Sequence, residues 1–68
     1  MNGICELMTV RDVAAALKLS TRTIWRMRAT GEIPQPIRVG RSVRWQRCEV
    51  EHWVIVKQEE ADAHDDRF

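Results

Sequence analysis

The sequence predicts a small, mainly α-helical domain that carries one short β-hairpin. Three observations lead to this fold class. Apolar residues recur at helical spacing from Val10 to Leu17, a second helical segment follows a short break, and apolar and basic residues alternate from Ile37 to Trp45. Because the chain has 68 residues, we expect one domain with a modest core and no deep catalytic cleft.

The first predicted helix begins after Thr9. Thr9 and Asp12 have the spacing of a capping box, in which the hydroxyl accepts a hydrogen bond from a backbone N–H and the acid reaches back to the capping residue. One apolar stripe follows at helical spacing: Val10, Val13, Ala14 and Leu17. Residues 1–8 are expected to form a short extended lead-in that places one or two side chains on the core.

The second predicted helix runs from its N-cap, Ser20, to about Thr30, and Gly31 supplies a left-handed stop. Two helices joined by three or four residues have the spacing of a DNA-reading helix-turn-helix. A turn of about 100° per residue divides this helix into two faces. One face carries Ser20, Ile24, Met27 and Gly31, and the other carries Arg22, Trp25, Arg26 and Ala29. Exposing the second face is costly unless a partner binds there.

A two-stranded hairpin is predicted after Pro34 and Pro36, which exclude a helix. Residues 37–45 read I-R-V-G-R-S-V-R-W, with Gly40, Arg41 and Ser42 at the tip. We expect the inward side chains to be Ile37, Val39, Val43 and Trp45, and the outward ones to be Arg38 and Arg44. The hairpin must lie against the helices, because two strands alone are only marginally stable.

A third helix is predicted from near Cys48 to about Glu60. Val50, Trp53 and Val54 form its inner stripe, whereas Ile55 points away and is either weakly covered or used for association. From Ala61 the chain is acidic and is expected to fray. The predicted organisation is therefore a lead-in over 1–8, a winged domain over 9–57 and an acidic tail over 58–68.

The predicted core draws on the large apolar residues of all these segments. Trp45 and Trp53 fall on inward positions, so we interpret them as core anchors and not as stacking platforms. The full set is Leu7, Val10, Val13, Leu17, Leu19, Ile24, Met27, Ile33, Ile37, Val39, Val43, Trp45, Val50 and Trp53.

The net charge of +1 conceals two oppositely charged regions. From Arg11 to Arg47 there are nine basic and two acidic residues, whereas from Cys48 to Phe68 there are seven acidic and two basic residues. Such asymmetry indicates contact with nucleic acid by the basic part and a solvated acidic end.

Several other classes of function are disfavoured. No apolar run is long enough to cross a bilayer, and the chain shows no secretory leader, so we expect a cytoplasmic protein with Cys5 and Cys48 as unpaired thiols. One bridge between these two cysteines is the alternative. Neither these cysteines nor His52 and His64 have zinc-site spacing, so no metal or cofactor is expected. The acids cluster on the predicted tail, so no enzyme activity is expected.

Four sequence blocks carry a resemblance to a known family. They are L-M-T-V-R-D-V-A-A-A-L-K-L-S-T-R-T-I-W-R-M, G-E-I-P, I-R-V-G-R-S-V-R-W and C-E-V-E-H-W. In this order the chain resembles the small MerR-like winged helix-turn-helix proteins typified by phage and plasmid excisionases and by small prophage regulators. The likeness covers about residues 6–54. Two positions depart from the pattern: Cys48 stands where the family usually has a capping Ser, and Arg28 stands where an apolar residue is common.

The resemblance implies that the second helix lies in the major groove and that the hairpin, as a wing, reaches the neighbouring backbone or minor groove. The recognition-helix positions are Thr21, Arg22, Thr23, Trp25 and Arg26. The wing positions are Arg38, Arg41, Ser42 and Arg44. Arg22 and Arg26 can contact base edges or phosphates, and the wing arginines are expected to contact phosphates. Trp25 is expected either to touch the sugar-phosphate backbone with its indole N–H or to fold over the hairpin.

The sequence therefore predicts a non-enzymatic protein that binds double-stranded DNA with sequence preference. By resemblance, it is an excisionase, or recombination directionality factor, of a bacterium or phage, associated with the nucleoid. It would bind cooperatively with further copies, bend DNA and direct an integrase toward excision. The alternatives are a small prophage-type transcriptional regulator and a protein-interaction adaptor that binds its partner through the Trp25 face.

Overall fold

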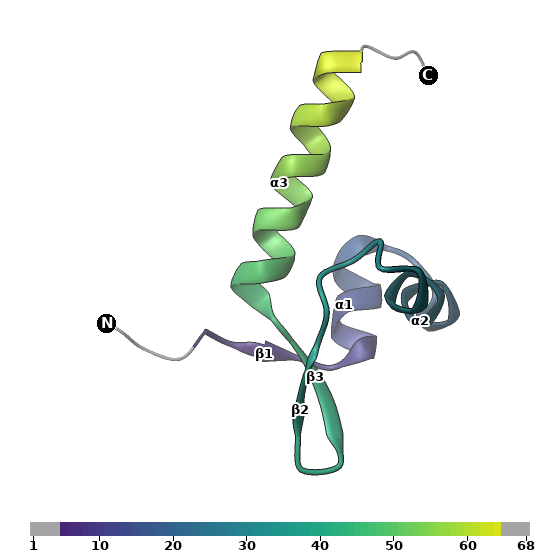
Figure 1. Cartoon of the computed structure of the whole chain (residues 1–68), viewed down its shortest axis with the longest axis vertical. Coiled ribbons are helices and arrows are strands. Elements are labelled where there is room, and N and C mark those ends of the chain that lie inside the picture. Colours follow the sequence, from purple (N-terminus) through teal and green to yellow (C-terminus); the bar gives the residue numbers. More distant parts are fainter. Residues whose placement is uncertain (1–4, 65–68) are drawn as a thin grey trace.

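The computed structural model describes residues 5–64, with side chains described up to residue 60. Along the chain lie β1 (Leu7–Met8), α1 (Val10–Leu17), α2 (Thr21–Thr30), β2 (Ile37–Val39), β3 (Ser42–Gln46) and α3 (Arg47–His64). The strands form one antiparallel sheet in the order β1-β3-β2. Figure 1 shows the β2–β3 hairpin and α3 projecting in opposite directions from the α1–α2 body. The predicted fold class, three helices with a small hairpin, is confirmed.

The ends of the first two helices follow from local sequence chemistry. Thr9 Oγ1 accepts from the Asp12 N–H at 3.1 Å, and Asp12 Oδ2 accepts from the Thr9 N–H at 3.0 Å. At the start of α2, Ser20 Oγ accepts from the Thr23 N–H at 3.0 Å. Gly31 ends α2 with φ +78°, a conformation that costs glycine little. Both predicted caps and the predicted stop are confirmed.

The register of the hairpin corrects the predicted facing of its side chains. A two-residue turn at Gly40 and Arg41 pairs Ile37 with Arg44, Arg38 with Val43, and Val39 with Ser42. Residues directly opposite each other share a face of the sheet. Val43 and Trp45 therefore lie on the face of Arg38, and Ile37 and Val39 lie on the other face with Arg44. The prediction that all four apolar side chains point inward, and both arginines outward, was wrong.

Three fully buried side chains, Trp45, Ile24 and Val13, form the centre of the core. Around them lie the other buried residues: Met8, Ala14, Ile33 and Val50. Four residues predicted in the core are exposed instead: Leu7, Leu19, Ile37 and Val39. Met8, which was not in the predicted core, is buried because β1 pairs it with Trp45 and so places both on the same face.

The Trp45 side chain also fixes the segment that leads into the hairpin. Its indole Nε1 donates to the Pro34 carbonyl oxygen at 2.9 Å. Since Trp45 is completely buried, this bond satisfies a donor that water cannot reach. Trp45 thereby joins the 31–36 loop to the sheet.

Helix α3 extends further than predicted. It begins at Arg47 directly after β3 and stays helical to His64, although the prediction placed its end near Glu60 and fraying from Ala61. The alanines at 61 and 63 favour a helix, and no glycine or proline stops it. Val50 is buried, Trp53 and Val54 are half-buried, and Ile55 is 52% exposed. The last part of the predicted tail, residues 65–68, lies outside the described residues.

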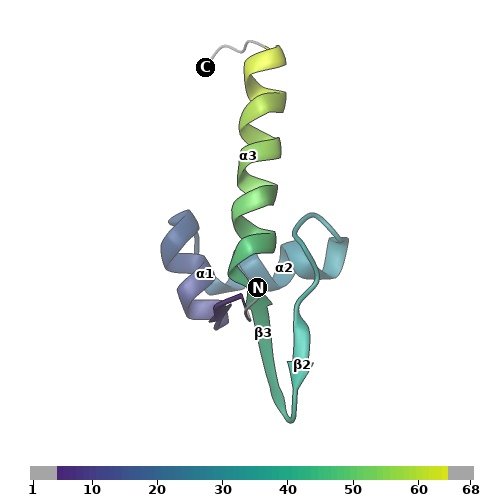
Figure 2. The same cartoon turned by 90° about the vertical axis from the view of Figure 1, so that its left-hand side faces the viewer.

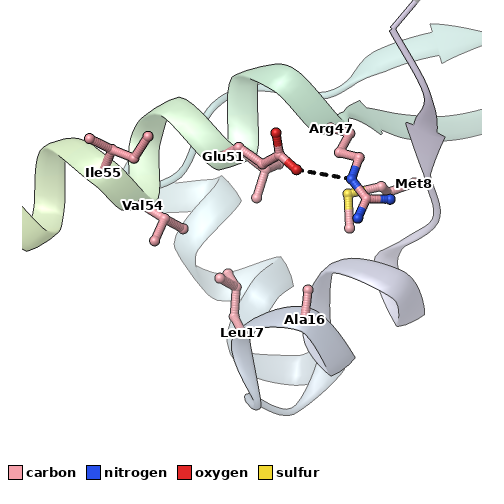
Figure 3. Close-up of a pocket in the computed structure, with 8 residues that line it drawn as sticks. Met8, Ala16, Leu17, Arg47, Glu51, Val54 and Ile55 are labelled. Carbon is pink, nitrogen blue, oxygen red and sulfur yellow. Dashed lines mark hydrogen bonds and ion pairs between the residues drawn. The ribbon is translucent and has the colours of Figure 1, made fainter.

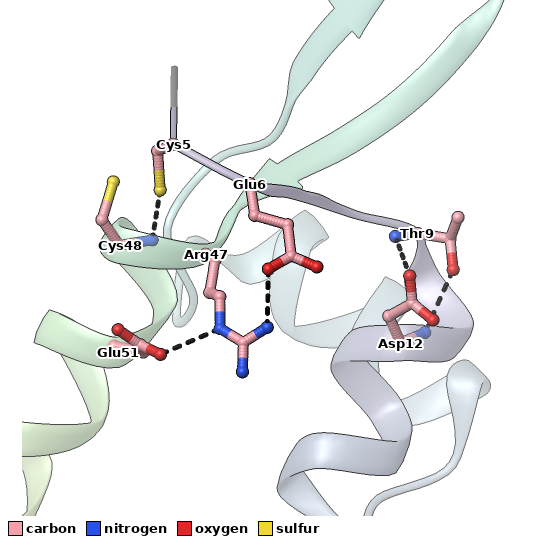
Figure 4. Close-up of polar contacts among 7 residues, drawn as sticks. All are labelled: Cys5, Glu6, Thr9, Asp12, Arg47, Cys48 and Glu51. Carbon is pink, nitrogen blue, oxygen red and sulfur yellow. Dashed lines mark hydrogen bonds and ion pairs between the residues drawn. The ribbon is translucent and has the colours of Figure 1, made fainter. Parts of the chain in front are cut away.

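The lead-in is joined to the start of α3 by three kinds of contact, and Figure 4 draws two of them, the ion pairs of Arg47 and the bond between Cys5 and Cys48. The Arg47 guanidinium pairs with Glu6 at 2.9 Å and with Glu51 at 3.0 Å. The Arg47 N–H donates to the Glu6 carbonyl oxygen at 2.8 Å. Cys5 Sγ accepts from the Cys48 N–H at 2.8 Å. The resemblance implied that Cys48 caps this helix, but Cys48 lies in the first turn of α3. Its N–H is satisfied by Cys5 Sγ of the lead-in.

These contacts also change the pKa values of Arg47 and Cys48. The hydrogen bonds to Glu51 and Glu6 raise the pKa of Arg47 above its usual value. The hydrogen bond with the Cys5 thiol, followed by partial desolvation, raises the pKa of the Cys48 thiol. Both cysteines are free thiols. Within residues 5–64, no helix has the length and apolar character to span a membrane.

Candidate nucleic-acid interface

Helix α2 separates buried and exposed side chains as its periodicity predicts. Ile24 is fully buried and Met27 is half-buried, so this side of the helix faces the core. On the opposite side, Arg22, Arg26 and Ala29 are exposed. The helix therefore presents two guanidinium groups to solvent on a rigid element.

The two threonines at the start of α2 differ in their surroundings. Thr21 is exposed. Thr23 is half-buried, and its Oγ1 accepts a hydrogen bond from the Ser20 hydroxyl at 2.9 Å, while Ser20 Oγ accepts from the Thr23 N–H. Of the predicted recognition positions, Thr23 thus takes part in the cap of the helix, whereas Thr21 leaves its hydroxyl facing solvent.

The arginines of α2 and of the hairpin have no carboxylate partner among the residues that the structure describes. The ion pairs found there join Arg47 to Glu6 and Glu51, and Lys57 to Glu60. Six guanidinium groups of α2 and the hairpin remain outside these pairs: Arg22, Arg26, Arg28, Arg38, Arg41 and Arg44. Cations gathered without counter-charges repel one another, and a polyanion is the partner that relieves this repulsion.

The hairpin presents its three arginines in different directions. Arg41 is exposed in the turn beside Gly40, whose φ is +62°. The register places Arg38 on the face of Trp45 and Arg44 on the opposite face. Arg44 is half-buried, and its Nη1 donates to the Val43 carbonyl oxygen at 2.8 Å. Figure 2 shows the hairpin projecting from the body. The wing arginines are therefore brought to one hairpin but not to one face of it.

Trp25 links α2 to the hairpin. Its ring centroid lies 5.7 Å from that of Trp45, with the rings tilted by 58°. The residue remains 40% exposed, so it packs over the sheet and still presents one side to solvent. This geometry agrees with the expectation that Trp25 folds over the hairpin, and it leaves ring surface for a partner.

A hollow of about 160 Å³ lies between α2 and the hairpin. It is lined by Trp25, Arg28, Pro36, Ile37, Arg38 and Val43. The Arg28 guanidinium carbon lies 5.7 Å from the centroid of the Trp25 ring, within the range of a cation–π contact. The sequence indicated Arg28 only as a departure from a family pattern. Its position three residues after Trp25, on the same side of the helix, is the signal that places it at this hollow.

A larger and more apolar hollow of about 450 Å³ lies between α1 and α3. Figure 3 shows Leu17 and Val54 reaching toward each other across it, with the Arg47–Glu51 ion pair at one end. Its lining is Met8, Ala16, Leu17, Arg47, Val50, Glu51, Val54 and Ile55. This hollow shares no lining residue with the one beside Trp25.

Two crossed helices, an exposed cationic second helix and a projecting basic hairpin define the class of helix-turn-helix proteins with a wing. A family model described as "Helix-turn-helix domain" matches residues 7–54 of the sequence. The match includes α1, α2 and the whole hairpin. This protein belongs to that helix-turn-helix family.

Two curated proteins of Mycobacterium tuberculosis, one from strain CDC 1551 / Oshkosh and one from strain ATCC 25618 / H37Rv, are similar to this chain. Each is 46% identical over 39 residues, which is 57% of this chain and 49% of the relative. The chain thus spans about half the length of the curated relatives it matches. Both relatives are named "Putative DNA-binding protein". No solved structure gives a significant match.

Proposed function

We propose that this protein binds double-stranded DNA through α2 and the β2–β3 hairpin. The observation that carries the proposal is the set of arginines on these two adjoining elements that have no carboxylate partner among the described residues. Binding to DNA phosphates would neutralise them and release counterions. Membership of the helix-turn-helix family and the names of the two relatives support the same conclusion.

In this complex, α2 lies in the major groove. Arg22 and Arg26 stand on its exposed face, from which a guanidinium can pair with the O6 and N7 atoms of guanine. Thr21, at the first turn, is suited to a phosphate. On the hairpin, Arg38, Arg41, Ser42 and Arg44 contact the backbone of the neighbouring groove. These phosphate contacts position the protein and do not read sequence.

More specifically, we propose that the protein acts as an excisionase, a recombination directionality factor. Bending a short DNA site costs on the order of 1–6 kcal/mol, which is a large demand on one domain of this size. Cooperative binding of neighbouring copies would offset that cost. The exposed Ile55, beside the apolar hollow between α1 and α3, and the acidic end of α3 offer a surface that complements the basic body of the next copy.

Salt-dependent binding tests the coarser proposal. The full chain is titrated against the duplex most enriched from a random library, and against its scrambled counterpart, at salt concentrations from about 50 to 200 mM. We expect tighter binding to the enriched duplex and a steep fall in affinity with salt. A slope near zero, with equal weak binding to both duplexes, would refute DNA binding as the main activity and favour the protein-interaction adaptor.

A recombination assay tests the finer proposal. The protein is added to an integrase encoded at the same locus, together with a DNA substrate that carries both junction sites. We expect excision to increase and integration to decrease, since the bent complex assembles the excisive arrangement. Unchanged excision, in the presence of intact DNA binding, would refute the excisionase role and leave the transcriptional regulator as the better interpretation.

A further inference from the structure

We infer that the hollow between α2 and the hairpin receives the sugar-phosphate backbone of one DNA strand, and that Arg28 is a phosphate contact. This inference rests on the proposed DNA binding and adds to it a site and a residue. It concerns the six residues that line the hollow, which we name the strand cleft: Trp25, Arg28, Pro36, Ile37, Arg38 and Val43.

The lining of the strand cleft combines two charged and several apolar side chains. Arg28 of α2 and Arg38 of the hairpin are both exposed, and neither has a carboxylate partner within residues 5–60. The rest of the lining is apolar and consists of Trp25, Pro36, Ile37 and Val43. A nucleic-acid strand alternates anionic phosphates with sugars whose C–H surface is apolar. The two guanidinium groups match the phosphates, and the apolar part matches a deoxyribose.

The small volume of the strand cleft favours a segment of a polymer as its ligand over a free small molecule. Sites for whole small ligands occupy about 300–1,000 Å³, whereas the strand cleft offers about 160 Å³. This volume suits one sugar with its phosphate at the mouth. No carboxylate or carboxamide side chain lines the cleft, so the side chains that read adenine or cytosine edges are missing from its lining.

The cleft is also held in shape before any ligand binds. Trp25 packs on the fully buried Trp45, whose indole N–H is fixed by the Pro34 carbonyl. The carbonyl oxygen of Arg28 accepts from Gln35 Nε2 at 3.3 Å, which joins the end of α2 to the loop before the hairpin. Since the two walls are already joined, binding need not order them, and less entropy is lost.

The first test compares two variants that remove the same charge. Arg28→Gln removes a cation from the strand cleft, and Lys57→Gln removes one from α3, where Lys57 pairs with Glu60. Binding of the full chain to a random-sequence duplex is measured by fluorescence anisotropy over a salt series. For Arg28→Gln we expect about tenfold weaker binding and a salt slope shallower by about 1. Lys57→Gln should bind as the wild type does.

The second test locates the phosphate. Single phosphates of the enriched duplex are replaced one at a time by neutral methylphosphonates, and the affinity of each duplex is measured. At one or two positions we expect the methylphosphonate to weaken binding by the wild-type protein but not by Arg28→Gln. The variant already lacks the ion pair between residue 28 and that phosphate. Arg38→Gln should be insensitive at the same position or the adjacent one. Circular dichroism melting of each variant confirms that it is folded.

The outcomes separate this inference from the proposed function. If the wild-type protein binds no duplex, the proposed function fails and this inference fails with it. If the wild type binds but Arg28→Gln behaves like Lys57→Gln, only the strand cleft is refuted. The same holds if both arginine variants lose affinity equally at every methylphosphonate position, since no particular phosphate then depends on Arg28.

Discussion

The two halves of this small domain use arginine in opposite ways. At the junction of the lead-in and α3, Arg47 pairs with Glu6 and Glu51, so its charge is used within the fold. On α2 and the hairpin, six arginines have no such pair among the described residues. One residue type thus joins segments in one half and is left for a partner in the other. The proposed DNA-binding surface is therefore distinguished by charge without counter-charge, more than by charge itself.

The largest effect is expected when Trp45, the core residue that both halves share, is removed. Trp45→Ala should destabilise the domain by about 3–5 kcal/mol, because it leaves a cavity in the core and deprives the Pro34 carbonyl of its donor. That is most of the stability expected for a domain of this size. Thermal unfolding by circular dichroism should show no cooperative transition near that of the wild type. Trp25→Ala is the matched control: since Trp25 is 40% exposed, a loss as large as that of Trp45→Ala would contradict its assignment to the surface.

The next prediction separates sequence reading from positioning. Arg22→Ala should reduce the preference for the enriched duplex over the scrambled one by about 1–3 kcal/mol, whereas Arg41→Ala should weaken binding to both duplexes together. Neither variant should change the melting temperature much, because both residues are exposed and outside the ion pairs of the described chain. If Arg22→Ala lost equal affinity for both duplexes, Arg22 would not be a base contact.

A smaller effect concerns the start of α2. Ser20→Ala should cost about 1 kcal/mol of stability, because the Thr23 N–H and the Thr23 hydroxyl both lose their bond with Ser20 Oγ. Denaturant unfolding measures this difference. Ser20→Asp, which keeps an acceptor at the cap, should restore the stability; a loss equal to that of Ser20→Ala would show that the cap is not the cause.

Arg47 should matter less than the residues above for both stability and DNA affinity. Arg47→Gln removes two exposed ion pairs, and an exposed ion pair contributes little to stability in water. We expect a melting temperature slightly below that of the wild type and a DNA affinity within experimental error of it. An affinity loss as large as that of Arg28→Gln would show that the surface around Arg47 also contacts DNA, and would end the contrast between the two halves.

The smallest effect is a shift in titration at the same junction. The pKa of Cys48 is raised by its hydrogen bond with Cys5, so the folded protein favours the neutral thiol. Its contribution to stability is therefore present below the pKa of an ordinary thiol and is lost as the pH rises through the raised value. NMR titration of the Cys48 side chain should show a midpoint above that of the unfolded chain. In Cys5→Ala the midpoint should fall; an unchanged midpoint would refute this cause.

Features that depend on neighbouring residues could be predicted from the sequence. The Thr9–Asp12 capping box, the Ser20 cap and the Gly31 stop each act over three or four residues, so the pattern alone locates them. The two faces of α2 follow from helical periodicity in the same way. The arginines of the candidate surface could also be named, because few acids stand near them in the sequence.

Features that depend on pairing between distant segments could not be predicted from the sequence. Whether Ile37 or Arg38 faces the core depends on the length of the turn, since a shift of one residue exchanges the two faces of a strand. Met8 is buried because β1 pairs it with Trp45 of β3. Arg28 and Arg38 line one hollow because α2 packs against the hairpin through Trp25 and Trp45.

Local sequence therefore determined where the helices begin and end and which cations are available. The tertiary structure decided which of those cations lie beside one another, because contacts between distant segments exist only once the sheet register and the packing of the two tryptophans are in place.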